Sequence, residues 1–178
     1  MRKLKLEELG RISIDEFKKT EKIPVVVVLD NIRSAHNIGS VFRTSDAFLI
    51  EKVYLCGITA TPPNKEIRKT ALGATESVEW EHVRETANLI PELKSAGFRI
   101  LAVEQTQGSK FLSEVELNPD EKYAVVFGNE VDGVQQPVIN QSDLCVEVPQ
   151  SGTKHSLNVS VCAGIVLWEF YKKLEIRN

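Results

Sequence analysis

The stretch IPVVVVL, residues 23–29, is the clearest sign of architecture in this chain. It is apolar throughout and rich in β-branched residues, which is typical of a parallel strand covered on both faces. Four more runs share this character, at 52–57 (KVYLCG), 98–104 (FRILAVE), 123–128 (YAVVFG) and 144–149 (LCVEVP). Helical patterns lie between them. The sequence therefore predicts an α/β fold with a mostly parallel sheet and helices on both faces.

The helical patterns divide the chain into an extension and one domain. Helices are expected at 39–49, 85–96, 135–142 and 156–174, with Pro91 as an irregularity in the second. A capping box formed by Ser13 and Glu16 begins another helix near the N-terminus. We therefore predict a helical extension over residues 1–22 and a single domain over 23–178.

Composition excludes several classes of protein. A chain of 178 residues with 42% hydrophobic side chains suits one domain, and no apolar run reaches the ~18 residues that span a membrane. The charged N-terminus lacks a signal-peptide core, so we expect a cytoplasmic protein. The cysteines Cys56, Cys145 and Cys162 are odd in number and far apart, which indicates free thiols, and their spacing indicates no metal site.

Charge bears on the choice of partner. The net charge is −3, so a nucleic acid would need a local basic patch. One candidate is residues 1–22, which hold seven basic and five acidic side chains, and another is 64–69 with Lys65, Arg68 and Lys69. The alternative interpretation of both segments is solvated charge on exposed helices.

Parallel sheets bind ligands at the carboxyl ends of their strands, so the strand exits are the places to search. No dinucleotide or P-loop glycine pattern is present. At the first exit, Asn37 can cap the next helix, and Arg43 lies four residues beyond Gly39. Arg43 would extend over the gap at Gly39 and, beside a helix N-terminus, favour an anion. The alternative is a surface ion pair of Arg43 with Asp46 or Asp30.

The third exit, FGNEVDGV (127–134), follows a buried strand. Gly128 would permit close approach of a ligand to the backbone. Glu130 places an acid at the sheet edge, which a plain turn does not require. The second exit, 103–109, is on its own only a polar loop.

The fourth exit, 148–161, leads into the closing helix. Ser156 can be its N-cap, whereas Asn158 inside an apolar helix would need hydrogen-bond partners. Lys154 and His155 could reach a polyanion.

Three ordered segments resemble the motifs of the SpoU/TrmH family: NIGSVFRTSDAF (37–48), FGNEVDGV (127–134) and VPQSGTKHSLNVSV (148–161). This family comprises S-adenosylmethionine-dependent RNA 2′-O-ribose methyltransferases of the SPOUT superfamily. The resemblance extends over about residues 24–173. KTALGATESV (69–78) further resembles the branch that methylates the D-loop guanosine of tRNA.

The resemblance implies an α/β knot with a C-terminal trefoil knot, and a homodimer whose site is completed at the subunit interface. It assigns the cofactor to the neighbourhood of Glu104, Gly128, Asn129, Val148 and Leu157. It assigns the catalytic positions to Arg43, Asn37, Glu130, Ser156 and Asn158. Arginine is a poor base, so we expect Arg43 to position the ribose hydroxyl and a phosphate electrostatically. No metal is needed.

The expected function is 2′-O-methylation of RNA, with a guanosine in tRNA as the first candidate substrate and ribosomal RNA as the second. A catalytically inactive RNA-binding protein of the same fold is an alternative from another class. A small-molecule methyltransferase is a third.

Overall fold

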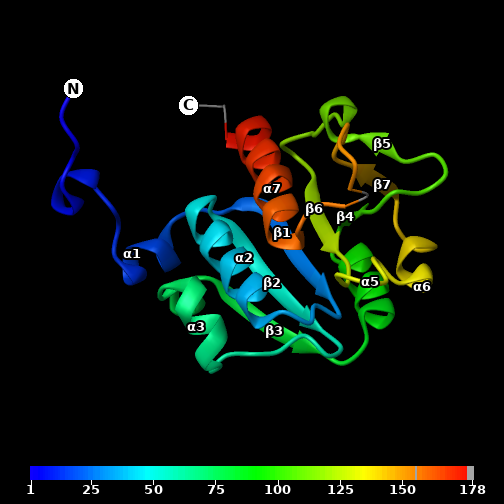
Figure 1. Ribbon diagram of the computed structural model, residues 1–178, viewed down its shortest axis with the longest axis horizontal. Coiled ribbons are helices and arrows are strands. Elements are labelled where there is room, and N and C mark those ends of the chain that lie inside the picture. The colour runs from blue at the N-terminus through cyan, green and yellow to red at the C-terminus, as the bar shows by residue number, and fades with distance from the viewer. Residues whose placement is uncertain (155, 176–178) are drawn as a thin grey trace.

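A single sheet of seven strands organises the computed structural model, which describes residues 1–154 and 156–175 (Figure 1). The strand order is β3-β2-β1-β6-β4-β7-β5, and every pairing is parallel, which confirms the predicted sheet. The strands are β1 Ile23–Asp30, β2 Ile50–Cys56, β3 Glu79–Val83, β4 Phe98–Val103, β5 Lys110–Phe111, β6 Lys122–Phe127 and β7 Leu144–Glu147. The α-helices are α1 Ile14–Lys19, α2 Ala35–Ala47, α3 Lys65–Ala71, α4 Ala74–Ser77, α5 Thr86–Ser95, α6 Gln136–Ile139 and α7 Val159–Glu175.

Strand β1 has apolar residues on both sides because helices cover both faces of the sheet. Val25, Val27 and Leu29 pack in one hydrophobic cluster with residues of α2 and α7. Val26 and Val28 point the other way and pack in a second cluster with residues of α5 and α6. Successive strand side chains alternate between faces, so each face receives its own set of valines.

Two predicted helix starts are wrong. Helix α2 begins at Ala35, four residues before the expected position, and Ser34 is its N-cap, because the Ser34 hydroxyl accepts a hydrogen bond from the Asn37 N–H. Helix α7 begins at Val159 rather than 156, and Asn158 precedes it. Helix α5 continues through Pro91, so the irregularity expected there does not end the helix.

Helices α2 and α3 pack backbone to backbone at Gly39. A Cβ atom at Gly39 would lie 2.1 Å from the Thr70 hydroxyl and 2.3 Å from the Ile67 carbonyl oxygen. The gap at Gly39 is therefore filled by α3, and the prediction that Arg43 extends over this gap is wrong.

Residues 1–22 carry a short 3₁₀ helix, η1 Leu6–Leu9, and helix α1. The predicted capping box is confirmed: the Ser13 N–H donates to the Glu16 carboxylate (2.8 Å), and the Glu16 N–H donates to the Ser13 hydroxyl (3.3 Å). Phe17 is buried in the same cluster as β1. The chain before α1 lies apart from the sheet (Figure 1). A second 3₁₀ helix, η2 Leu112–Glu114, follows β5.

Within the described part of the chain, no helix is long and apolar enough to cross a membrane. The prediction that His155 contributes to anion binding lies outside the described residues, as do the last three residues of the domain predicted over 23–178.

Candidate functional site

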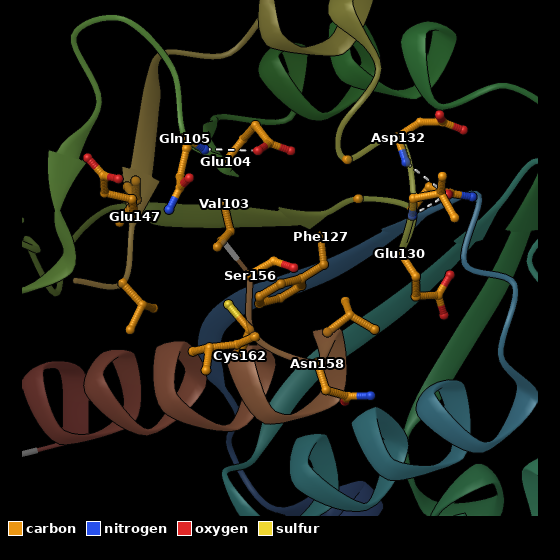
Figure 2. A pocket seen from close by; sticks show the side chains of 18 of the residues that line it. Val103, Glu104, Gln105, Phe127, Glu130, Asp132, Glu147, Ser156, Asn158 and Cys162 are labelled. Atoms are coloured by element: carbon orange, nitrogen blue, oxygen red, sulfur yellow. Dashed lines mark hydrogen bonds between the residues drawn. The ribbon is translucent and has the colours of Figure 1, made fainter. Parts of the chain in front are cut away.

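Three strand ends and the start of α7 enclose a cavity of about 450 Å³ (Figure 2). Its walls come from the exits of β4, β6 and β7, as the strand-end rule predicts. Apolar side chains, among them Val103, Phe127 and Cys162, line part of it. All five residues assigned to the cofactor lie in its lining, namely Glu104, Gly128, Asn129, Val148 and Leu157. So do three of the five assigned to catalysis, Glu130, Ser156 and Asn158.

The charged side chains that line this cavity are acidic. Four carboxylates line it, those of Glu104, Glu130, Asp132 and Glu147. Among the described residues that line it there is no lysine or arginine. Such a lining disfavours a phosphate-bearing ligand and favours one with positive charge. Glu147 is not among the predicted site residues, although it ends β7 beside the fourth exit.

The loop 128–133 forms one wall by folding back on itself. The Asn129 and Gly133 backbones exchange two hydrogen bonds of 2.9 Å. A Cβ atom at Gly128 would lie 2.1 Å from the Gly133 carbonyl carbon and from the Val134 nitrogen. The absence of a side chain at Gly128 therefore lets the loop pack against its own backbone, and the approach of a ligand to this glycine stays a prediction.

Glu104 ties the β4 exit to this loop. One carboxylate oxygen accepts from the Gln105 N–H (2.9 Å), and the other accepts from the Val134 N–H (2.9 Å). Gly133, with φ +71°, lies where any Cβ would meet the Glu104 carboxylate at 2.1 Å. Both carboxylate oxygens thus accept hydrogen bonds from backbone N–H groups, and the Glu104 side chain fixes the shape of the cavity wall.

Asn37, Glu130 and Asn158 form a chain of hydrogen bonds between three distant segments. The Asn37 amide donates to Glu130 (3.0 Å), and the Asn158 amide donates to the Asn37 oxygen (3.2 Å). Glu130 also accepts from the backbone N–H groups of Arg33 (2.9 Å) and Ser34 (3.1 Å). The cavity is thereby joined to the N-terminal end of α2.

These hydrogen bonds govern the pKa of Glu130. Partial burial by itself raises the pKa of the carboxyl group. The hydrogen bonds from Arg33 N–H, the Asn37 side chain and Ser34 N–H stabilise the charged form, and together they hold the pKa below its usual value. Glu130 is therefore present as a carboxylate near neutral pH.

Asn158 is the N-cap of α7. Its side-chain oxygen accepts from the N–H groups of Ser160 (2.9 Å) and Val161 (3.3 Å), and its carbonyl accepts from the Cys162 N–H (2.9 Å). The prediction that Asn158 has hydrogen-bond partners is confirmed, but its expected place inside the helix is wrong. Ser156, predicted as a possible cap, instead lies in the exposed loop that lines the cavity.

Arg43 is the one predicted catalytic residue that the structure leaves apart. It is exposed on α2, two turns beyond His36, and does not line the cavity. The alternative ion pairs are also wrong: among the described side chains, Arg43 forms no ion pair with Asp46, Asp30 or any other carboxylate. Asp46 instead accepts a hydrogen bond from Ser77.

Two cysteines have perturbed thiols. Burial raises the pKa of Cys56 to about 12 and that of Cys162, in the cavity lining, to about 11. Both are free, as predicted, and in the described chain there is no cluster of ligands for a metal ion.

Comparison with known proteins assigns this arrangement to a family. Residues 24–168 match the family model described as SpoU rRNA Methylase family. The chain belongs to the SpoU rRNA methylase family. This SpoU chain is 32% identical over 164 residues to the 23S rRNA (guanosine-2′-O-)-methyltransferase RlmB of Neisseria meningitidis. The match covers 92% of the SpoU chain but 64% of that relative, so the chain spans less than two thirds of the relative's length.

Solved structures of SpoU relatives share the fold. The A. aeolicus TrmH/SpoU tRNA modifying enzyme superposes with a TM-score of 0.80 at 27% identity, over 91% of this chain and 82% of its own. The AdoMet-bound rRNA methyltransferase from Sinorhizobium meliloti also gives 0.80, at 24% identity over 89% of this chain and 60% of its own.

Proposed function

We propose that this SpoU family chain transfers a methyl group from S-adenosylmethionine to a ribose 2′-hydroxyl of RNA. The observation that carries the proposal is the acidic strand-end cavity, whose rim is joined to α2 through Asn158, Asn37 and Glu130. The fold and family of the chain, and the RNA-modifying activities named for its relatives, support it.

The cavity fits this cofactor by charge and by lining. S-adenosylmethionine carries a sulfonium and an ammonium group, which suit a cavity with four carboxylates and, among its described lining residues, no basic side chain. Phe127, Val148 and Leu157 offer apolar surface for an adenine ring. The residues that would hold the cofactor are Glu104, Gly128, Asn129, Val148 and Leu157. When bound, the cofactor supplies an activated methyl group, and the Sinorhizobium meliloti relative was solved with the same ligand bound.

The protein must align the ribose hydroxyl for attack and assist loss of one proton. We assign Arg43 to holding the hydroxyl and a neighbouring RNA phosphate, since a guanidinium donates hydrogen bonds and has no acceptor. The proton released from the hydroxyl can then pass to solvent. Asn37 and Glu130 fix the start of α2, on which Arg43 lies. Ser156 and Asn158 shape the mouth of the cavity.

We propose that a second copy of the chain completes this site, because Arg43 lies outside the cavity of its own chain. An apolar stripe on α7 supports a dimer: Val161, Ile165 and Trp168 are 52%, 40% and 50% exposed. The Trp168 ring lies 5.6 Å from that of Phe48, so the stripe reaches the C-terminal end of α2, the helix that carries Arg43. Monomeric proteins rarely expose contiguous apolar patches of this kind.

A mixed dimer tests whether Arg43 acts across the interface. An Arg43→Ala chain is combined with an Asn158→Ala chain that is inactive by itself. If Arg43 serves the partner's cavity, the mixed dimer regains one working site and roughly half of the activity. If Arg43 serves its own cavity, the mixed dimer stays inactive.

Trp168→Glu tests the proposed interface directly. Light scattering should show a monomer, and a dimer of unchanged stability would contradict the interface.

Exposed cations supply a surface for RNA. Lys65 and Arg68 on α3 are exposed, and neither forms an ion pair in the described chain. The third cation of that segment, Lys69, pairs with Glu66 (2.8 Å), as does His36 (2.9 Å). Arg43 lies seven residues beyond His36 and so continues the α2 face that contacts α3. The RNA backbone can therefore approach along α2 and α3, with residues 1–22 as a further candidate contact.

The substrate that we propose first is a guanosine of tRNA, and ribosomal RNA is the alternative, because the names of the compared relatives include both classes.

We also propose that the chain forms the trefoil knot of its superfamily. The placement of β6 between β1 and β4, and the return of α7 to the α2 side of the sheet, support it (Figure 1). A cytoplasmic location is part of the proposal and agrees with three free cysteines.

The deciding experiment incubates the chain with unmodified total RNA and labelled S-adenosylmethionine, followed by mapping of 2′-O-methylated positions. Arg43→Ala should lose transfer yet bind the cofactor, with Arg43→Lys as the charge-matched control. Tight RNA binding without transfer in a single turnover would identify an inactive binder. Transfer to free nucleosides alone would identify a small-molecule enzyme.

A further inference from the structure

Asp30, the last residue of β1, is a fully buried carboxylate without a cation. Its exposed fraction is 0%, and among the described residues no basic side chain forms an ion pair with it. Burial of a carboxylate costs free energy unless hydrogen bonds replace its hydration. Four donors do so here: the Asn31 side chain, the Thr86 hydroxyl, and both the backbone N–H and side-chain amide of Gln135.

Two of these donors belong to Gln135, which lies just beyond the loop that forms the cavity wall. The Gln135 N–H donates to one Asp30 oxygen (3.0 Å) and the Gln135 side chain to the other (3.1 Å). The preceding residue, Val134, is held by Glu104. Asp30 therefore fixes the far end of the loop, although it does not itself line the cavity.

The near end of the same loop is reached through Asn31. The Asn31 side chain donates to Asp30 (2.9 Å), and its backbone carbonyl accepts from the Asn129 side chain (2.7 Å). Asn31 has a left-handed backbone, with φ +56°, which places its side chain and carbonyl for these two contacts. One buried carboxylate thus constrains both ends of a wall whose middle carries Glu130.

We propose that Asp30 is a positioning residue for the cofactor cavity. Through Gln135 and Asn31 it holds the 128–133 loop, and with it Glu130, in the shape that binds S-adenosylmethionine. This inference rests on the proposed function. A carboxylate suits the position because both of its oxygens can accept hydrogen bonds. Asparagine has nearly the same shape but would turn an NH₂ group toward the Gln135 N–H or toward the other donors, so one side of the network must break.

Thr86 offers a matched control. Its hydroxyl donates to the same carboxylate from the start of α5, a helix that is not part of the loop. Thr86→Val removes a buried hydrogen bond to Asp30 but leaves Gln135 and Asn31 in place. If Asp30 only stabilises the fold, both variants should lose cofactor affinity in proportion to their loss of thermal stability. If Asp30 positions the loop, Asp30→Asn should lose far more affinity than its loss of thermal stability accounts for, and Thr86→Val should not.

The test measures the melting temperature, the Kd for S-adenosylmethionine by calorimetry, and hydrogen exchange of the 129–135 segment. Asp30→Asn should raise Kd by about tenfold or more and speed exchange in the segment. Thr86→Val should lower the melting temperature while leaving Kd and the exchange of the segment unchanged. Folded Asp30→Asn with wild-type Kd and exchange, or equal proportional losses in both variants, would overturn the inference.

Two outcomes need a second readout. If Asp30→Asn does not fold, Gln135→Met decides, because it removes one donor to Asp30 and Gln135 is not part of the cavity lining. An unchanged exchange of the segment in that variant would refute the positioning role. If the wild-type chain binds no S-adenosylmethionine, the proposed function fails, whereas the exchange comparison still tests the hold of Asp30 on the loop.

Discussion

Gly39→Ala tests the packing that places α2 against α3. The added Cβ would lie 2.1 Å from the Thr70 hydroxyl and 2.3 Å from the Ile67 carbonyl oxygen. The Thr70 side chain can rotate, at the loss of its hydrogen bond to the His36 carbonyl (2.9 Å). The Ile67 oxygen is helix backbone and cannot rotate away, so the two helices must separate by roughly an ångström to reach ordinary contact.

The expected magnitude is a balance of two effects. Overpacking of this kind costs about 1–3 kcal/mol, whereas replacing a mid-helix glycine by alanine gains about 1 kcal/mol. Because the clash is with helix backbone, its cost should lie in the upper part of this range, at about 2–3 kcal/mol. The net loss should then be about 1–2 kcal/mol, which lowers the melting temperature by about 2–8 °C for a chain of this size. Without the clash, alanine would instead stabilise α2, so the sign of the change is diagnostic.

Calorimetry and urea unfolding followed by circular dichroism provide the assay, with Ser40→Ala as the control. The Ser40 hydroxyl donates to the His36 carbonyl of its own helix (2.9 Å), so its loss should change stability by less than about 0.5 kcal/mol. A Gly39→Ala protein as stable as the wild type, or more stable, would refute the close approach of α2 and α3.

Three further predictions concern the site. Glu130→Gln should destabilise the fold most near neutral pH. Because hydrogen bonds depress the folded pKa of Glu130, its contribution to the unfolding free energy is fully present above the unfolded pKa of about 4.3. The difference between variant and wild type should therefore shrink as the pH falls below that value and vanish once the pH is below the folded pKa. Asn158→Ala should cost about 1 kcal/mol through loss of the α7 cap and should also abolish methyl transfer, as urea unfolding and kinetics can show. In the folded protein at a pH of about 7.5, alkylation of Cys56 and Cys162 should be slow, since burial raises their pKa values to about 12 and about 11. Mass spectrometry can follow the alkylation, and rapid labelling of either thiol would contradict its buried environment.

The sequence predicts the strands that are apolar on both faces, and it does not predict the exposed or very short strands. The five apolar runs correspond to β1, β2, β4, β6 and β7. The sequence EWEHV of β3 gives no such signal, because this edge strand is largely exposed, and β5 is only two residues long. Residues 64–69 are predicted only as a basic segment, yet most of them belong to α3. The signal for this helix lies in the cap Asn64 and in Ile67 and Ala71, four residues apart and both buried.

The candidate site is predictable in its members and not in its connections. The strand exits lead to Glu130, Asn37 and Asn158, and the motif resemblance assigns them to catalysis. Nothing local shows that these three share hydrogen bonds across 93 and 121 residues. Asp30 illustrates the same limit. It directly follows a predicted strand, yet its role depends on Gln135, 105 residues later.

The cap of α2 is misplaced in the prediction for a related reason. Ser34 and Asn37 are both good caps, and the choice between them depends on where α2 meets its neighbours. Because the Asn37 side chain bonds Glu130 and Asn158, it is not available to the helix start, and Ser34 takes that role. A residue with two favourable local roles is thus assigned by tertiary contacts.

The structure separates the proposed catalytic cation from the acids of the cavity. Asn37 and Arg43 lie six residues apart on α2, a rise of about 9 Å along the axis. Asn37 bonds Glu130, while Arg43 faces solvent without an ion pair in the described chain. An ion pair between Arg43 and Glu130 would neutralise both groups and would detach Glu130 from α2. Because Glu130 accepts hydrogen bonds from amide and backbone donors instead, Arg43 stays free for the proposed contact with a phosphate. The cavity also stays acidic, which suits the sulfonium of the proposed cofactor. The spacing of asparagine and arginine in NIGSVFR therefore lets one helix contact the acidic cavity wall at Asn37 and present a free cation at Arg43, without cancelling either charge.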